Sequence, residues 1–136
     1  MRARSPEEFF RVGRSETGLG LFATGVIEKG TFIIEYLGPR ISNDEVHRRR
    51  NTRYLFEVNS RWTIDGSPRW NTARYINHSC RPNAEAVVSR GRIRIKAVKR
   101  ITPGDEITYN YGKNYFDTFI KPVGCKCLAC RKRSGK

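Results

Sequence analysis

The sequence of 136 residues lacks long apolar runs, and this absence excludes a membrane-spanning helix. Such a helix needs roughly 20 apolar residues in succession. The chain starts Met1-Arg2-Ala3-Arg4, without the apolar segment of a secretory signal peptide. We therefore expect a soluble intracellular protein with no membrane partner. Hydrophobic residues make up 38% of the chain, which at this length suits one compact domain and not two.

Acidic residues are scarce. The chain holds 13 Asp and Glu against 27 Lys and Arg, for a net charge of +14. Such an excess attracts polyanions, for example nucleic acid, a nucleosome or an acidic protein surface. Basic residues gather at Arg48, Arg49, Arg50 and Arg53, and the acid-free segment 121–136 holds six more. A solvated basic face is the alternative, because charge indicates a class of partner without specifying a function.

Strand signals dominate the chain, and no repeat is present. Apolar or alternating segments bounded by Gly, Asn and Ser predict strands at residues 9–12, 20–24, 31–37, 54–58, 61–65, 85–89, 92–98 and 106–109. Arg90-Gly91 lies between two of them and predicts a tight hairpin turn. We therefore expect one mostly β domain made of several small sheets.

Helix signals are few. A capping box at Ser42 predicts a short, very basic helix over residues 42–50. Ser67-Pro68 predicts the start of a second helix over residues 67–74, because proline is well tolerated in the first helical turn. Neither segment is long enough to change the expected fold class.

Gly18, Gly20 and Ala23 match the dinucleotide-binding fingerprint G-x-G-x-x-G/A. That fingerprint works through a helix that begins at the glycines and points its N-terminus at a pyrophosphate. Only residues 24–30 separate Ala23 from the next predicted strand, whereas a parallel crossover needs about a dozen residues. We therefore reject this interpretation. The glycines still permit a positive φ and the close approach of a ligand to the backbone.

Two polar segments, 74–83 and 104–111, are the most informative. In the first, Asn77-His78-Ser79-Cys80 follows an apolar start, and this run predicts a polar loop with a functional role. The second ends in two tyrosines spaced i and i+2, whose side chains point to the same face of a strand.

With these segments the chain resembles the SET-domain protein lysine methyltransferases. Four motifs of that family occur in the family's order: Gly18-x-Gly20, Glu35-Tyr36-Leu37-Gly38, Asn77-His78-Ser79-Cys80-x-Pro82-Asn83 and Asp105-Glu106-Ile107-Thr108-x-x-Tyr111. The resemblance implies a SET domain over residues 9–112 and a post-SET zinc-binding and basic tail over residues 113–136. It also implies a pseudo-knot, in which the C-terminal segment passes under the loop that contains Asn77.

The resemblance assigns roles to single residues of this chain. The cofactor would be S-adenosylmethionine, and the residues expected to bind it are Thr17, Gly18, Leu19, Gly20, Tyr54, Asn77 and His78. Tyr36 would line the channel for the substrate lysine. Tyr111 matches the catalytic tyrosine. Tyr109 occupies the position where the family has Phe or Tyr, and Tyr there goes with transfer of mainly one methyl group.

The expected chemistry explains these residue types. Methyl transfer is an in-line displacement, so positioning of the amine can supply much of the catalysis. The amine must be neutral to attack, whereas a free lysine has a pKa of about 10.4. An apolar aromatic channel beside a cationic sulfonium disfavours the ammonium form. Asp105 and Glu106 face opposite sides of a strand, so we assign them structural roles.

The chain has four cysteines: Cys80 in the polar loop, and Cys125, Cys127 and Cys130 near the end. Three clustered thiols and one distant thiol suit a zinc ion held by four thiolates better than disulfides. The resemblance likewise implies one structural zinc at these positions. The tail spacing is C-x-C-x2-C, whereas the family usually has C-x-C-x4-C. Free thiols, or a disulfide formed on oxidation, are the alternatives.

Protein lysine methylation is the leading function, with a histone or another lysine-bearing protein as the substrate. One alternative is a SET-fold module with weak catalysis that binds chromatin or nucleic acid through its basic surface. Intact Asn77, His78 and Tyr111 argue against lost activity. The segment between the Glu35 motif and Tyr54 is short, which leaves substrate recognition weakly specified.

Overall fold

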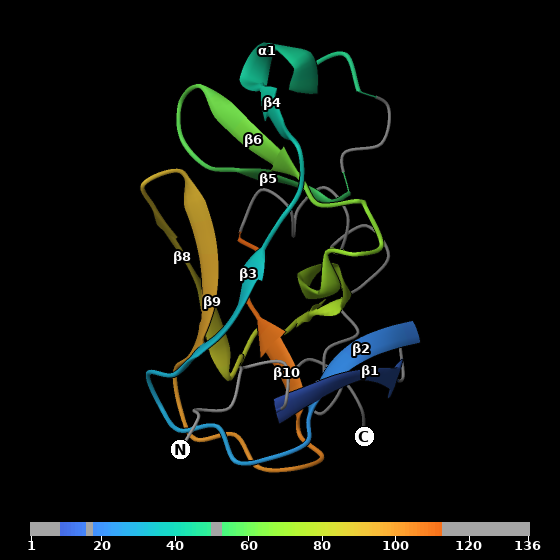
Figure 1. Cartoon of the computed structure of the whole chain (residues 1–136), viewed down its shortest axis with the longest axis vertical. Helices are drawn as coiled ribbons and strands as arrows, with labels where there is room; N and C mark the ends of the chain where they lie inside the picture. The colour runs from blue at the N-terminus through green and yellow to red at the C-terminus, as the bar shows by residue number, and fades with distance from the viewer. Residues whose placement is uncertain (1–8, 16–17, 50–52, 113–136) are drawn as a thin grey trace, which may run out of the picture.

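A computed structural model describes residues 9–15, 18–49 and 53–112, and the structural statements below concern these residues. They form strands, one short α-helix and one 3₁₀ helix (Figure 1). In chain order the elements are β1 Phe10–Ser15, β2 Gly18–Ala23, β3 Phe32–Tyr36, β4 Arg40–Ser42, α1 Asn43–Val46, β5 Leu55–Glu57, β6 Trp62–Asp65, η2 Thr72–Tyr75, β7 Asn77–His78, β8 Ala84–Ser89, β9 Arg92–Ala97 and β10 Glu106–Tyr109.

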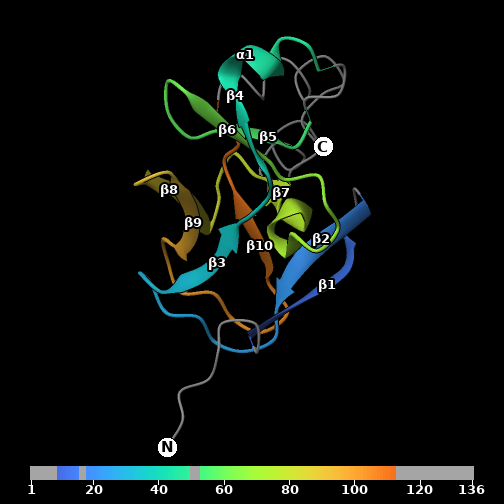
Figure 2. The ribbon, with the colours of Figure 1, turned by 45° about the horizontal axis from the view of Figure 1, so that its top comes forward.

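The strands make three small sheets, with the orders β1-β2-β10-β7, β3-β9-β8 and β4-β6-β5. Alternation of side chains along β9 buries Ile93 and Ile95 against the core and leaves Arg92 and Arg94 exposed. Figure 2 shows β10 in the middle of the molecule, between the β3-β9-β8 sheet and the β1-β2 hairpin. The predicted fold class, mostly β in several small sheets, is confirmed.

The β8-β9 hairpin has the predicted two-residue turn. Ser89 pairs with Arg92, and the turn residues Arg90 and Gly91 both have positive φ, at 53° and 75°. Two successive positive φ angles are typical of the turn whose twist matches that of antiparallel strands. Because the side-chain period of a strand is two, this turn fixes which residues of β9 face the core.

The helix predictions were wrong in extent. α1 covers only Asn43–Val46, although the Ser42 hydroxyl caps it by accepting from the Glu45 amide at 3.2 Å. None of its residues is buried, so no packing extends it into the arginines that follow. The segment that begins at Ser67-Pro68 makes a turn first, and its 3₁₀ helix starts only at Thr72.

Two short strands were not predicted. β4 pairs with β6, and β7 forms where the sequence predicted a polar loop. β7 pairs in parallel with β10, joining Asn77 to Thr108 and His78 to Tyr109. The pseudo-knot stays a prediction, because residues 113–136 lie outside the described part of the chain. Within the described part, no helix is long and apolar enough to cross a bilayer.

Candidate active site

A row of aromatic rings runs through the middle of the domain. Tyr36 packs on Phe56 with ring centroids 5.3 Å apart, and Phe56 stacks on Tyr109 at 6.5 Å. Tyr109 lies 5.0 Å from Tyr111, which lies 5.4 Å from the His78 ring. We call these five residues the aromatic row. The structure thus brings together four residues that the sequence had singled out, and it adds Phe56.

Tyr36 is held tightly at one end of the row. Its side chain is 4% exposed, and its hydroxyl donates to the backbone oxygen of Tyr54 at 2.7 Å. A Cβ at Gly66 would lie 2.3 Å from the Tyr36 ring, and a Cβ at Gly38 would lie 1.9 Å from the Asp65 oxygen. Both positions therefore require glycine, because any side chain there would collide with the neighbouring atoms.

Tyr111 is fixed at the other end by two contacts to the polar loop. Its hydroxyl donates to the backbone oxygen of Ile76, and its amide donates to Nδ1 of His78 at 3.1 Å. Since Nδ1 accepts, the proton of neutral His78 lies on Nε2, which is 3.4 Å from the Cys80 sulfur. Burial lowers the pKa of His78 from its ordinary value, which favours this neutral form.

Asn77 ties the polar loop to the glycine segment. Its amide nitrogen donates to the Leu19 oxygen at 2.9 Å and to the Glu106 carboxylate at 2.7 Å. Gly18 has a φ of +126°, and nothing surrounds the place of its absent Cβ. A Cβ at Gly20 would lie 2.5 Å from the Glu106 carboxylate. The backbone of Gly18 and Leu19 is thus exposed and held against Asn77, whereas Gly20 is buried, and a ligand can approach closely at Gly18.

The Asp105-Glu106 pair has the structural roles expected of it. The Asp105 carboxylate accepts from the Thr102 amide and hydroxyl, both at 2.9 Å, and closes a turn. Glu106 orients Asn77. The two carboxylates therefore have separate partners, one in the turn and the other beside the polar loop.

Arg74 is a site residue that the sequence reasoning missed. Its guanidinium lies 4.3 Å from the centroid of the Tyr54 ring. Its Nε is buried and has no hydrogen-bond partner within the described residues. Buried donors are rarely left without an acceptor, and Arg74 Nε is an unsatisfied donor within the described residues. The sequence signal that could have pointed to Arg74 is its position three residues before Asn77.

Asn71 and Asn83 also hold the site together. Asn71 accepts from the Leu37 amide and donates to the Gly66 oxygen, both at 3.0 Å, and so braces the segments around Tyr36. Asn83 donates to the Glu106 oxygen at 2.8 Å and accepts from the Thr108 amide at 2.9 Å. Asn83 belongs to the motif that begins at Asn77, but no pattern in the sequence indicates that its side chain contacts β10.

Some predicted site residues are not tested. Thr17, Cys125, Cys127 and Cys130 lie outside the described residues. Cys80 is described, with its sulfur beside His78. Among the residues that the structure describes, no group of three or more His, Cys, Asp or Glu could hold a metal ion. The zinc site therefore stays a prediction.

Comparisons with known proteins identify the domain. A family model described as SET domain matches residues 18–112. Histone-lysine N-methyltransferase 2D of Homo sapiens is 39% identical over 127 residues, which cover 85% of this chain and 2% of that protein. Histone-lysine N-methyltransferase Set2 of Drosophila melanogaster is 38% identical over 134 residues, covering 89% and 6%. The putative histone-lysine N-methyltransferase ASHH4 of Arabidopsis thaliana is 34% identical over 139 residues, covering 91% and 38%.

Fold and site together define a class of protein: a mostly β domain in which a partly buried aromatic row lies beside an Asn-His loop and the exposed backbone of Gly18 and Leu19. The family match makes the assignment specific: the chain belongs to the SET domain family. It spans much less than two thirds of the length of these relatives. What the whole relatives act on is therefore a matter for proposal.

Proposed function

We propose that this chain transfers methyl groups from S-adenosylmethionine to lysine side chains of a protein, either a histone or another basic protein inside the cell. The observation that carries the proposal is the aromatic row, which ends at Tyr111 beside the loop of Asn77 and His78. A lysine side chain is long and apolar up to its amine, so a channel lined by aromatic rings suits it.

The residues beside the row fit the cofactor. The exposed backbone of Gly18 and Leu19, the side chain of Asn77 and the ring of Tyr54 would hold it. The unpartnered Nε of Arg74 suits the carboxylate at its methionine end, since guanidinium donors pair well with carboxylates. When bound, the cofactor supplies a methyl group on a cationic sulfur.

The residues of this chain would prepare the amine. Tyr36 and Tyr109 are 4% and 5% exposed, so an amine that reaches the aromatic row would lose its water shell, which favours its neutral form. The Tyr111 hydroxyl donates a hydrogen bond to the backbone oxygen of Ile76. Its oxygen can therefore only accept a hydrogen bond from any further group. That oxygen would orient the amine without adding a formal charge to the channel.

We propose that the main product is monomethyl-lysine. The Tyr109 ring lies between those of Phe56 and Tyr111, and its hydroxyl takes up room that a bulkier amine would need. A water held by this hydroxyl would also have to leave before a second transfer.

We also propose one structural zinc held by Cys80, Cys125, Cys127 and Cys130. Metal binding and folding are coupled in such sites, so chelation should unfold the tail and abolish activity. The purified, reduced protein should contain about one zinc per chain by elemental analysis. An active preparation without metal would contradict this assignment.

The test of the function is incubation with labelled S-adenosylmethionine and a panel of histones and other proteins, followed by mass spectrometry. We expect methyl-lysine with the wild-type chain and almost none with Tyr111→Phe. The alternative is a SET-fold module without catalysis. It would be supported if the folded wild-type chain methylated no protein and also failed to bind the cofactor in calorimetry. Tight cofactor binding would argue against that alternative.

A further inference from the structure

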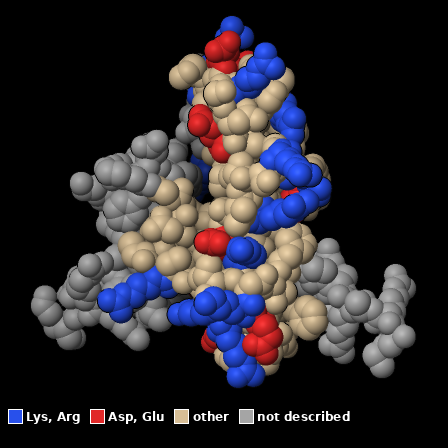
Figure 3. Space-filling model, turned by 90° about the vertical axis from the view of Figure 1, so that its left-hand side faces the viewer, with Lys and Arg blue, Asp and Glu red and all other residues tan. Residues whose placement is uncertain are grey.

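The outer face of the β3-β9-β8 sheet carries a concentration of positive charge that the proposed reaction does not use. Arg92, Arg94 and Lys96 project from β9, and Arg90 lies in the hairpin turn. Arg40 of β4 reaches this hairpin, where its guanidinium donates to the Gly91 oxygen at 3.0 Å. We call Arg40, Arg90, Arg92, Arg94 and Lys96 the basic face. Figure 3 shows mostly Lys and Arg among the charged side chains on this side of the molecule.

Only part of this charge is compensated. Glu35 holds Arg92 through both carboxylate oxygens, at 2.6 and 3.0 Å, and this contact lowers the pKa of Glu35. Glu85 lies 3.8 Å from Lys96. Arg94 is the direct cross-strand neighbour of Glu35 and is attracted by its carboxylate, but the same carboxylate already holds Arg92, so one acid faces two arginines. Repulsion among uncompensated arginines is unfavourable, so a bound anion would stabilise this arrangement.

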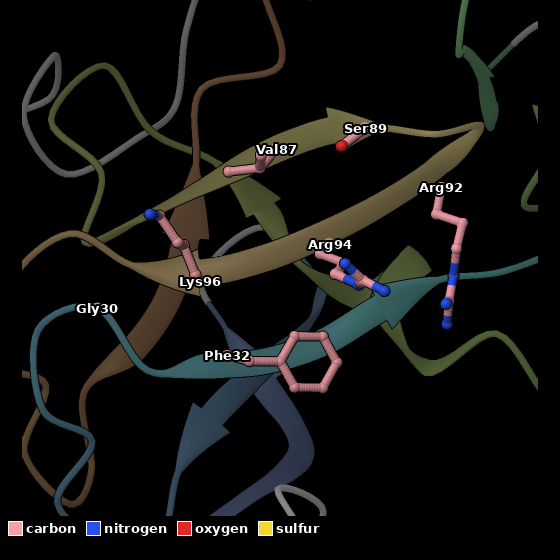
Figure 4. Close-up of a pocket in the computed structure, with 7 residues that line it drawn as sticks. All are labelled: Gly30, Phe32, Val87, Ser89, Arg92, Arg94 and Lys96. Atoms are coloured by element: carbon pink, nitrogen blue, oxygen red, sulfur yellow. The ribbon is translucent and has the colours of Figure 1, made fainter.

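The surface is shallow. A hollow of about 140 Å³ lies over the sheet, where Val87 of β8 pairs with Arg94 and Phe32 of β3 pairs with Lys96 (Figure 4). Small-molecule sites measure roughly 300–1,000 Å³, so this hollow is too small for a typical ligand. The large apolar side chains that line the hollow, Phe32 and Val87, are accompanied by three basic ones, so this face lacks the apolar core of a typical protein interface. Protein–nucleic acid interfaces are, by contrast, polar and strongly positive.

We propose that the basic face binds the phosphate backbone of a nucleic acid. Arginine is suited to this role because its planar fork donates two hydrogen bonds to one phosphate. Because the proposed contacts are to phosphates, the binding would be independent of sequence and sensitive to salt. Such a contact would place the domain beside nucleic acid without taking part in methyl transfer.

The test compares two variants of equal net charge. Arg90→Asn with Arg94→Gln removes two charges from the basic face, and asparagine tolerates the positive φ at position 90. Arg48→Gln with Arg69→Gln removes two exposed charges from other elements, α1's flank and the segment before η2. Binding of a fluorescent DNA duplex of arbitrary sequence is followed by anisotropy, without cofactor, between about 50 and 200 mM salt. Thermal unfolding confirms that both variants are folded.

We expect the first variant to bind about tenfold more weakly than wild type at low salt. The slope of log affinity against log salt concentration should become shallower by the amount that corresponds to about two phosphate contacts. The control variant should stay within about twofold. Equal weakening of both variants would overturn the proposal in favour of diffuse charge attraction, as would a wild-type chain that does not bind the duplex. Polyglutamate that competes equally well would instead favour an acidic protein partner. A failed methylation assay would leave this result unaffected.

Discussion

The two sides of β9 differ in burial and charge: the inner side is apolar and tightly packed, and the outer side is exposed and basic. On the inner side, Ile93 and Ile95 are fully buried and support the aromatic row, whose members are fixed by backbone oxygens and by glycines that leave no spare room. On the outer side, Arg92 and Arg94 are exposed and make contacts that solvent can replace. Substitutions on the inner side should therefore change geometry and activity, whereas those on the outer side should change charge and little else.

The largest effect is expected at Tyr111. Tyr111→Phe removes the hydroxyl that would orient the amine and should lower turnover by about a hundredfold or more, while cofactor binding stays near wild type. Single-turnover assays and calorimetry measure the two quantities. Tyr75→Phe, outside the aromatic row, should keep activity within about threefold. Activity of Tyr111→Phe within severalfold of wild type would remove Tyr111 from the reacting centre.

Gly66 tests how tightly the inner side is packed. Gly66→Ala places a methyl group 2.3 Å from the Tyr36 ring, so the ring must move. We expect a loss of about 1–3 kcal/mol in the free energy of unfolding, typical of overpacking, and a clear loss of activity. In the control Gly13→Ala, the nearest atom is the flexible end of Arg11, and denaturant unfolding should change little. Equal stability of the two variants would show that the surroundings of Tyr36 are loosely packed.

Tyr109 should change the product more than the rate. Tyr109→Phe removes a hydroxyl from the centre of the row and gives a methylated amine room to realign, so the product should shift towards di- and trimethyl-lysine. Mass spectrometry at early time points measures the distribution, and total transfer should remain comparable. Trimethyl-lysine as the main early product of the unmodified chain would refute the assignment.

The smallest effect belongs to the outer side. Arg92 lowers the pKa of Glu35 from 4.5, so the carboxylate form is favoured in the folded state. This pair therefore stabilises the fold above that ordinary value, and its contribution is lost as the pH falls through the lowered pKa. Glu35→Gln should be slightly less stable than wild type at pH 7 and equally stable in acid, by denaturant unfolding. A difference that persists in acid would point to packing instead.

The sequence was sufficient to predict those features of the two sides of β9 that depend on local patterns. Alternation along residues 92–98 and the Arg90-Gly91 turn were sufficient to assign the two faces of β9. The family motifs picked out Tyr36, Tyr109, Tyr111 and His78, which the structure brings together. Residue-by-residue periodicity could not show this, because the row joins strands far apart in the chain.

What the sequence missed depended on tertiary contacts. A capping signal at Ser42 could not reveal that α1 buries nothing and so stays short. Phe56 and Arg74 matter through what they touch, and neither carries a local pattern that indicates its partner. β7 was assigned to a loop because its two polar residues are strand-like only beside β10.

The hydrogen bonds of Asn83 have a consequence for how the chain folds. This side chain joins the polar loop to β10 across 25 residues, and its amide oxygen accepts from the Thr108 amide at 2.9 Å. Closing such a loop costs conformational entropy before it brings any packing in return, so the connection should form late. The Thr108 amide should therefore remain open to hydrogen exchange until the loop docks. Its protection would report the moment at which the active centre is assembled.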